Sequence, residues 1–310
     1  MENTRAKTTR NSLILLLTAT IWGMAFVSQS KGMDYMHPFT FNGVRSLIGA
    51  AGILVYILIS RKIAGDKAAK LDWKLNVKAG LLCGIFLTIA STLQQFGIKY
   101  TSVGKAGFIT TLYIIFVPMF GIFLKKKVAP VVWAAAGMAA VGMYLLCMTE
   151  SLRLGAGDIM VFLCAIAFAI QIMTVDHYAA SIDGAVVSCI QFTVCGVVCC
   201  IGALIWGQPT FGQIQEGLGA LLYAGVLSCG VGYTLQIVGQ KGLNPTVAAL
   251  IMSLESVIAT ISGWIAYKIG FLSTDQTLTP RQIAGCIIVF AAVILVQLPP
   301  EWFCFGKKNA

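Results

Sequence analysis

Residues 92–99 read TLQQFGIK and residues 234–241 read TLQIVGQK, so five of the eight positions are identical. Both octapeptides lie in apolar stretches and are 142 residues apart. The same separation, or register, relates further pairs of identical residues on the C-terminal side of each octapeptide. That register pairs Ala106 with Ala248, Leu112 with Leu254, Gly121 with Gly263 and Lys126 with Lys268. We interpret the match as an internal repeat, with chance alignment of two apolar sequences as the alternative.

A second register, of 146 residues, relates the starts of the two halves. It pairs Leu17 with Leu163, Ala19 with Ala165, Trp22 with Phe168 and Arg45 with Gln191, and Pro130 matches Pro280 before the last apolar segment of each half. The midpoint falls near residue 150. We therefore predict one repeat over residues 1–150 and a second over residues 151–310.

The composition places the chain in a membrane. Of its 310 residues, 58% are hydrophobic and 11% are charged, with a mean hydropathy of +0.84. Soluble domains are about 45–50% apolar and about 25% charged. Disordered chains, collagens, coiled coils and small disulfide scaffolds are excluded, and no long polar stretch exists to form a soluble head on a single anchor.

Ten segments are long and apolar enough to cross a bilayer as helices, which takes about 20 residues. They are residues 12–30, 39–59, 77–98, 103–124, 131–148, 158–176, 185–206, 217–239, 246–267 and 281–298. No segment alternates as a barrel strand does. The predicted fold is an all-α membrane protein of ten transmembrane helices. Because each half holds an odd number of spans, the halves enter the membrane from opposite sides as two inverted five-helix repeats.

The basic residues predict the orientation. An even number of spans puts both termini on one side, which carries Arg5, Lys7, Arg10, Arg61, Lys62, Lys67, Lys70, Lys74, Lys78, Lys125, Lys126, Lys127, Lys241, Lys307 and Lys308. The other side carries Lys31, Lys99, Lys105, Arg153, Lys268 and Arg281. Loops rich in Lys and Arg stay in the cytoplasm. We expect a multi-pass protein of the cell membrane with both termini cytoplasmic. A net charge of +10 would suggest nucleic-acid binding in a soluble protein, but here the basic residues sit mostly in short connections between apolar segments, where they set topology, so we expect no nucleic-acid partner.

Several short motifs together resemble a known family. They are Ile21-Trp22-Gly23, Tyr100-Thr101-Ser102, Gly157-Asp158, Leu243-Asn244-Pro245 and Leu254-Glu255-Ser256. In their order and spacing they resemble EamA-type members of the drug/metabolite transporter superfamily. The resemblance implies export of amino acids or related metabolites from the cytoplasm. Such families often end the fourth and ninth spans with Gly-Glu, where this chain has Lys125-Lys126 and Tyr267-Lys268, so a role for those acids does not carry over.

Glu255 is the acidic residue that sits well inside a predicted span, about nine residues from either end of 246–267. An ionisable group there costs a few kcal/mol on insertion scales and is a functional candidate by default. Low polarity favours the protonated form of a carboxyl group, as a proton-coupling site requires. We predict that Glu255→Gln removes the pH dependence of transport. The alternative is a structural lock that holds the ninth span to its neighbours.

Arg45 is the basic residue inside a predicted span, about six residues from the outer end of the second. Its guanidinium group suits a carboxylate or phosphate of a substrate. The shallow position of Arg45 favours a structural or gating role instead. In that role the side chain reaches toward the membrane surface or onto the carbonyls at a helix end. The sequence does not say whether Arg45 and Glu255 are close.

Amides and aromatic residues complete the candidate site. We predict a central cavity lined by Gln94, Gln236, Trp22 and Tyr113, with Gln171 as a further member. An amide within the membrane needs a partner, so these glutamines either bridge helices or face a wet cavity. The mixture of amides and rings suits a small zwitterionic or aromatic solute.

Other classes of function fit less well. Gly155-Ala156-Gly157-Asp158 is the Gly-x-Gly-Asp string of intramembrane aspartyl proteases, but the nearest second carboxylate, Asp176, is 18 residues along the same helix, about 27 Å away. A receptor would need a signalling domain. We predict no enzyme, no metal and no cofactor. The expected partners are a small-molecule substrate and the lipid bilayer, with the chain working as a monomer or weak homodimer and import or exchange as the alternative to export.

Overall fold

The computed structural model describes residues 2–65, 71–101, 103–124, 128–147, 155–272 and 277–297. Within these ranges every regular element is a helix. The predicted repeat boundary at residue 150 lies outside the described residues. So do eight of the charges used to predict the orientation, namely Lys67, Lys70, Lys125, Lys126, Lys127, Arg153, Lys307 and Lys308.

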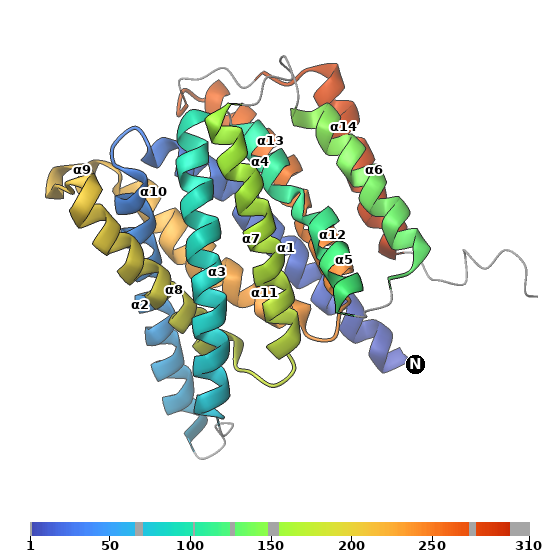
Figure 1. The fold of residues 1–310 in the computed structure, drawn as a ribbon, viewed down its shortest axis with the longest axis horizontal. Helices are drawn as coiled ribbons and strands as arrows, with labels where there is room; N and C mark the ends of the chain where they lie inside the picture. Colours follow the sequence, from blue (N-terminus) through green and yellow to red (C-terminus); the bar gives the residue numbers. More distant parts are fainter. Residues whose placement is uncertain are drawn as a thin grey trace, which may run out of the picture.

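The described chain forms a single helical bundle (Figure 1). Its elements are α1 (Glu2–Gly32), α2 (Pro38–Ala64), α3 (Trp73–Tyr100), α4 (Val103–Thr111), α5 (Tyr113–Phe123), α6 (Pro130–Cys147), α7 (Ala156–Tyr178), α8 (Gly184–Gly202), η2 (Ala203–Gly207), α9 (Phe211–Glu216), α10 (Leu218–Leu222), η3 (Tyr223–Gly232), α11 (Tyr233–Gln240), α12 (Pro245–Met252), α13 (Leu254–Lys268) and α14 (Pro280–Gln297). Both η2 and η3 are π-helical.

Short polar residues begin several of these helices. Asp72 accepts a hydrogen bond from the amide of Leu75 at 3.0 Å at the start of α3. Asp183 does the same for two amides of α8. Asn244 precedes a proline and caps α12. Such caps satisfy amides that have no partner inside the helix, and so fix where each helix begins.

Eight helical segments in the described chain are long and apolar enough to span a membrane. They coincide with eight of the ten predicted spans. The other two predicted spans, 131–148 and 281–298, correspond to shorter apolar helical segments, Pro130–Leu145 and Pro280–Leu295. These two helices, α6 and α14, pack against each other at one edge of the bundle (Figure 1).

Two of the spanning segments are interrupted at positions that agree to within one residue in the 142-residue register. One stops at Leu112, between α4 and α5, and the other at Ser253, between α12 and α13. At the first interruption the Thr111 hydroxyl donates to the carbonyl of Phe108 at 2.9 Å. At the second, the Ser253 hydroxyl donates to the carbonyl of Leu250 at 2.7 Å. These two bonds are related by the 142-residue register, and bonds of this kind bend helices.

Helix contacts follow the same pairing of halves. Helix α3 of the first half packs on α7 of the second half, and correspondingly η3 and α11 of the second half pack on α1 of the first. Between them α2 packs on α8. The buried centre therefore lies where α1, α2, α3, α5, α7, α8, α11 and α13 face one another.

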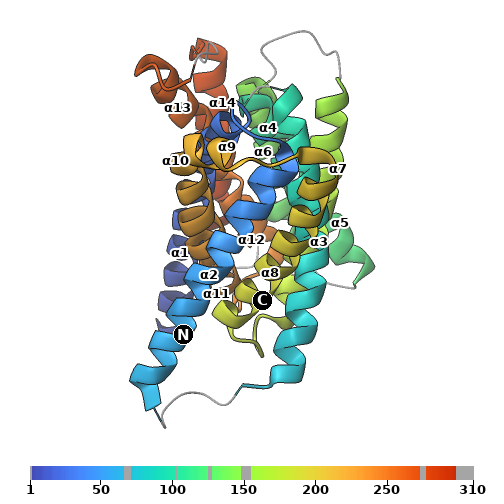
Figure 2. The ribbon, with the colours of Figure 1, turned by 90° about the vertical axis from the view of Figure 1, so that its left-hand side faces the viewer.

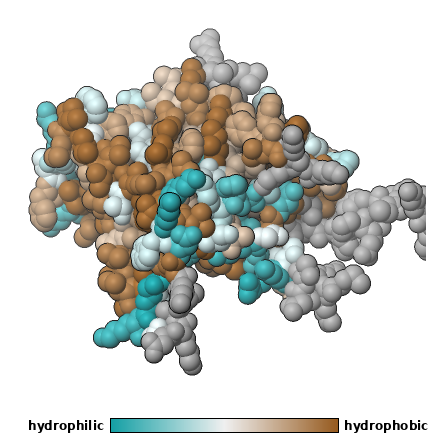
Figure 3. Space-filling model, turned by 60° about the horizontal axis from the view of Figure 1, so that its bottom comes forward, coloured by the Kyte–Doolittle hydropathy of each residue, from teal (hydrophilic) through white to brown (hydrophobic). Residues whose placement is uncertain are grey.

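The outside of the bundle is apolar along its flank. Large hydrophobic side chains such as Leu54, Leu58, Ile201 and Ile265 are about half exposed. Hydrophilic residues gather at the end of the bundle that comes forward in Figure 3, whereas hydrophobic ones cover the flank. This distribution is typical of a hydrophobic belt in contact with lipid and a polar end in contact with water. The chain is therefore a multi-pass membrane protein.

Candidate substrate cavity

A small cavity of about 40 Å³ lies at the centre of the bundle. That is room for a few water molecules. Sites that hold organic ligands measure about 300–1,000 Å³, so the helices must move apart before the cavity can hold a metabolite. All seven residues predicted from the sequence line it: Glu255, Gln94, Gln236, Trp22, Tyr113, Arg45 and Gln171.

The lining follows the internal registers. Sixteen of its twenty residues form eight pairs, each related by 142 or 146 positions. The pairs are Trp22 with Phe168, Ala25 with Gln171, Phe26 with Ile172, Ser46 with Phe192, Leu87 with Cys229, Ser91 with Tyr233, Gln94 with Gln236 and Tyr113 with Glu255; Gln29, Arg45, Thr110 and Ser228 complete the lining. Both halves thus contribute the same positions, with different chemistry at most of them.

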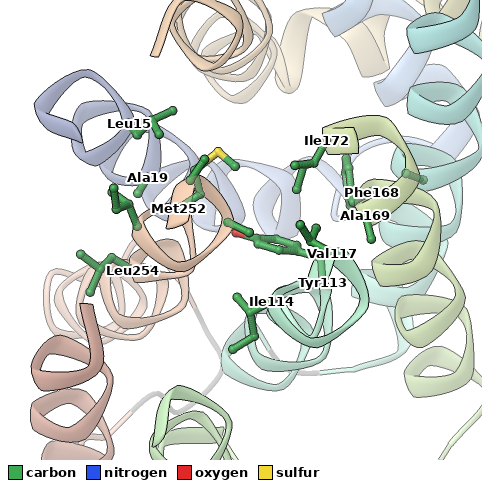
Figure 4. Close-up of a cluster of buried hydrophobic side chains, with 14 of the residues drawn as sticks. Leu15, Ala19, Tyr113, Ile114, Val117, Phe168, Ala169, Ile172, Met252 and Leu254 are labelled. Carbon is green, nitrogen blue, oxygen red and sulfur yellow. The ribbon is translucent and has the colours of Figure 1, made fainter. Parts of the chain in front are cut away.

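Tyr113 and Glu255 meet across the two interrupted helices. The Tyr113 hydroxyl donates a hydrogen bond of 3.1 Å to Oε1 of Glu255, and the two side chains are 2% and 4% exposed. Figure 4 shows the ring of Tyr113 reaching from α5 toward Met252 and Leu254 at the other interruption. Because the two residues are equivalent in the 142-residue register, this bond lies between corresponding points of the two halves.

Glu255 also lies in the first turn of α13. The free amides and positive end of the helix dipole there favour negative charge. The interruption after Ser253 therefore places the buried carboxyl group where it is partly stabilised without a cation.

Amide side chains bridge helices at the cavity wall. Gln171 of α7 and Gln236 of α11 exchange hydrogen bonds of 3.4 and 3.2 Å. Gln94 of α3 donates to the Thr110 hydroxyl of α4 at 3.2 Å. The sequence left two roles open for these glutamines, bridging helices or facing a cavity. In the structure they do both.

Arg45 enters the cavity wall from α2 and is 5% exposed. This burial argues against a side chain that reaches the membrane surface. Its guanidinium carbon stands 5.4 Å from the ring centroid of Phe41, and its Nε is buried without a hydrogen-bond partner. No ion pair joins Arg45 to Glu255, both of which the structure describes. The cavity therefore presents a cation and a carboxyl group that do not satisfy each other.

An aromatic wall closes one side of the cavity. The rings of Trp22 and Tyr233 stand 4.5 Å apart, and Phe192 meets Tyr233 edge-on at 5.0 Å. The indole of Trp22 donates to the carbonyl of Ser228 at 3.4 Å. Phe192 was not among the predicted site residues. Applying the register to Ser46 would have found it, had Ser46 been recognised as a wall residue.

Asp158, the acidic residue of the Gly-x-Gly-Asp string, bonds to Lys105 and Thr101 and not to a second carboxylate. It accepts hydrogen bonds from Lys105 at 2.6 Å and Thr101 at 2.7 Å, at the start of α7. Asp176 lies near the other end of the same helix. The two carboxylates do not form a catalytic pair.

Comparisons with known proteins agree with the resemblance found in the sequence. The model of the EamA-like transporter family matches residues 10–148 and residues 155–298. An uncharacterized transporter from Archaeoglobus fulgidus is 28% identical over 290 residues, covering 92% of this chain and 84% of the relative. The uncharacterized transporter YwfM of Bacillus subtilis is 24% identical over 295 residues, 94% of each protein.

A solved crystal structure has a similar fold. It aligns with a TM-score of 0.71 over 93% of this chain and 96% of its own, at 16% sequence identity. At that identity the likeness concerns the fold alone.

Proposed function

This chain belongs to the EamA-like transporter family, and we propose that it is a secondary transporter that exports small organic metabolites such as amino acids by alternating access. The observation that carries the proposal is the central cavity, which both halves line at matching positions. Transporters place their substrate sites near the middle of the membrane, between repeats and beside interrupted helices. The interruptions beside Tyr113 and Glu255 fit that arrangement.

The proposed architecture is ten transmembrane helices in two inverted repeats, residues 1–150 and 151–310. Its support is the eight register pairs around the cavity, the paired helix interruptions and the two stretches matched by the family model. In this arrangement α6 and α14 are the fifth and tenth spans. The charge distribution supports a location in the cell membrane with both termini in the cytoplasm.

The size of the cavity supports alternating access. About 40 Å³ is too small for an amino acid, so this conformation is closed around the centre. Two similar halves that rock against each other would open the same cavity first to one side and then to the other.

The charges of the cavity suit a zwitterion. Arg45 offers a buried cation whose Nε has no partner, and Glu255 offers a carboxyl group held by one tyrosine. A solute that carries both a carboxylate and an amine satisfies both groups at once. The rings of Trp22 and Tyr233 supply apolar contact for a side chain. The aromatic wall also favours the amine, because cations are attracted to ring faces.

Glu255 is the proposed coupling group. Its carboxyl group binds the amine of the solute when ionised and a proton when the solute leaves. Exchange of one for the other on the same group would link export of solute to entry of protons. The protein needs no other chain for this cycle, so we propose that it works as a monomer or weak homodimer.

The experiment is a mass-spectrometric comparison of the medium from cells that express wild type, Glu255→Gln or Glu216→Gln. Glu216 is an exposed acid on α9 and serves as the matched control. We expect a zwitterionic solute to accumulate outside with wild type and Glu216→Gln, and much less with Glu255→Gln. Depletion of a solute from the medium would favour import instead. Equal media from wild type and empty vector, with the protein present in the membrane, would contradict export.

A further inference from the structure

A second cavity is lined by residues of α2, α3, α8 and α11 and of the loops beside them. Figure 2 shows these four helices side by side in the bundle. The volume of the cavity is about 610 Å³. We call it the end cavity and define it by Tyr56, Arg61, Asn76, Asp183, Thr234 and Lys241, which line it. Unlike the central cavity, it is large enough for an organic solute. Its position is the end that the positive-inside rule assigns to the cytoplasm.

The two cavities share two helices, α8 and α11, each of which lines both. On α11, Thr234 lines the end cavity, whereas its neighbours Tyr233 and Gln236 line the central one. On α8, Ala185 lines the end cavity and Phe192 the central one. Seven residues of helix span about 10 Å, so a path between the cavities along α8 is short.

Unpartnered polar atoms occupy that short stretch of α8. Ser188 and Gln191 lie between Ala185 and Phe192, and both are 0% exposed. The hydroxyl of Ser188 and both polar atoms of the Gln191 amide are buried without a hydrogen-bond partner. Buried polar groups are nearly always satisfied by protein or water. These three atoms therefore point to another state of the molecule in which water or solute satisfies them.

The wall formed by α11 adjoins an irregular segment. The π-helical η3 runs directly into α11 at Tyr233, and π-helical turns within helices often mark functional sites. The wall at α11 is therefore continuous with an irregular segment of the chain.

We propose that the end cavity is a vestibule that binds a polar organic solute before it enters the central cavity. When α11 moves aside, Ser188 and Gln191 form the polar path between the two cavities. The inference rests on the proposed transport function. A solute with an anionic group suits the vestibule, because the Asp72 and Asp183 carboxylates already cap helices while Arg61 stands in the lining.

The test measures access to the path without knowledge of the substrate. The double variant Ser188→Cys/Cys189→Ala, which removes the native thiol next to the introduced one, is treated in membrane vesicles with N-ethylmaleimide, and modified peptides are quantified by mass spectrometry. Native Cys83, also 0% exposed, is the internal control in the same molecule. We expect Ser188→Cys to react at least tenfold faster than Cys83. Equal rates would overturn the path.

A blocking variant locates the entrance. Adding Thr234→Trp fills the end cavity from α11, and we expect it to slow the labelling of Ser188→Cys about tenfold. Val231→Trp lies on the outer surface nearby, where Val231 is 39% exposed, and should leave labelling unchanged. Equal labelling with both tryptophans would overturn the vestibule.

Efflux then separates this inference from the proposed function. Ser188→Ala and Gln191→Leu remove atoms that have no partner, so we expect unchanged Tm and several-fold slower efflux; a structural role would lower Tm as well. If wild type exports a solute and Thr234→Trp exports it equally fast, the vestibule is wrong and the transporter stands. If wild type exports nothing while the labelling pattern holds, the export proposal fails and the path stands.

Discussion

The hydrogen bond between Tyr113 and Glu255 makes a quantitative prediction. Tyr113→Phe keeps the ring and removes the hydroxyl that donates to Glu255 at 3.1 Å. Both side chains are almost fully buried, so the carboxyl group loses its donor where water has little access. Leaving such a group unsatisfied costs about 1–3 kcal/mol. For a protein of this size each kcal/mol lowers Tm by roughly 2 °C, so we expect a fall of about 2–6 °C.

The assay is thermal unfolding in detergent at a fixed scan rate, because membrane proteins often unfold irreversibly. Tyr56→Phe, which changes a tyrosine that is 61% exposed, is the control and should not change Tm. A double-mutant cycle with Glu255→Leu, which removes the acceptor oxygen that Gln would keep, should give a coupling free energy of about 1 kcal/mol or more. A coupling near zero would refute the claim that this bond joins the two interrupted helices.

Three further predictions concern stability. Burial lowers the pKa of His37, whose Nδ1 accepts a hydrogen bond at the start of α2. The unfolded chain therefore binds a proton more readily at this residue, and the folded protein should lose stability as pH falls below about 6.5. Thermal melts at pH 5 and pH 8 should show that loss in wild type and not in His37→Asn. Lys105→Met leaves the buried Asp158 without its cation and should cost about 2–3 kcal/mol, less than the roughly 3–5 of a fully buried pair, whereas a loss below about 0.5 kcal/mol would show that the pair is unimportant. Gly97→Ala puts a Cβ into a methyl group of Val161 at the α3–α7 crossing and should destabilise by about 1–3 kcal/mol. Gly52→Ala, with open space around it, should be neutral or stabilising by up to about 1 kcal/mol.

Much of the candidate site could be predicted from the sequence because polar residues are expensive in a membrane. Glu255, Gln94 and Gln236 stand out in apolar segments, and the structure places all three around one cavity. The repeat register adds positions that polarity alone does not reveal. It relates Trp22 to Phe168, an apolar residue that also lines the cavity.

Other features depend on packing between distant segments. The helix interruptions at Leu112 and Ser253 carry no glycine or proline at those positions. Each lies at or beside a residue whose hydroxyl bonds to the helix backbone. The burial of Arg45 could not be read from its distance to the end of a span. The end cavity is formed by four helices and the loops between helices, and its lining residues are unremarkable in sequence.

The most direct test of the proposed proton coupling is transport by purified protein in proteoliposomes under an imposed pH gradient. We expect wild type and Glu216→Gln to drive a zwitterionic solute against its concentration gradient in exchange for protons. Glu255→Gln should fold, insert and lose the response to the pH gradient. A Glu255→Gln protein that responds to the gradient as wild type does would contradict the role of Glu255 and, with it, the proposed mechanism.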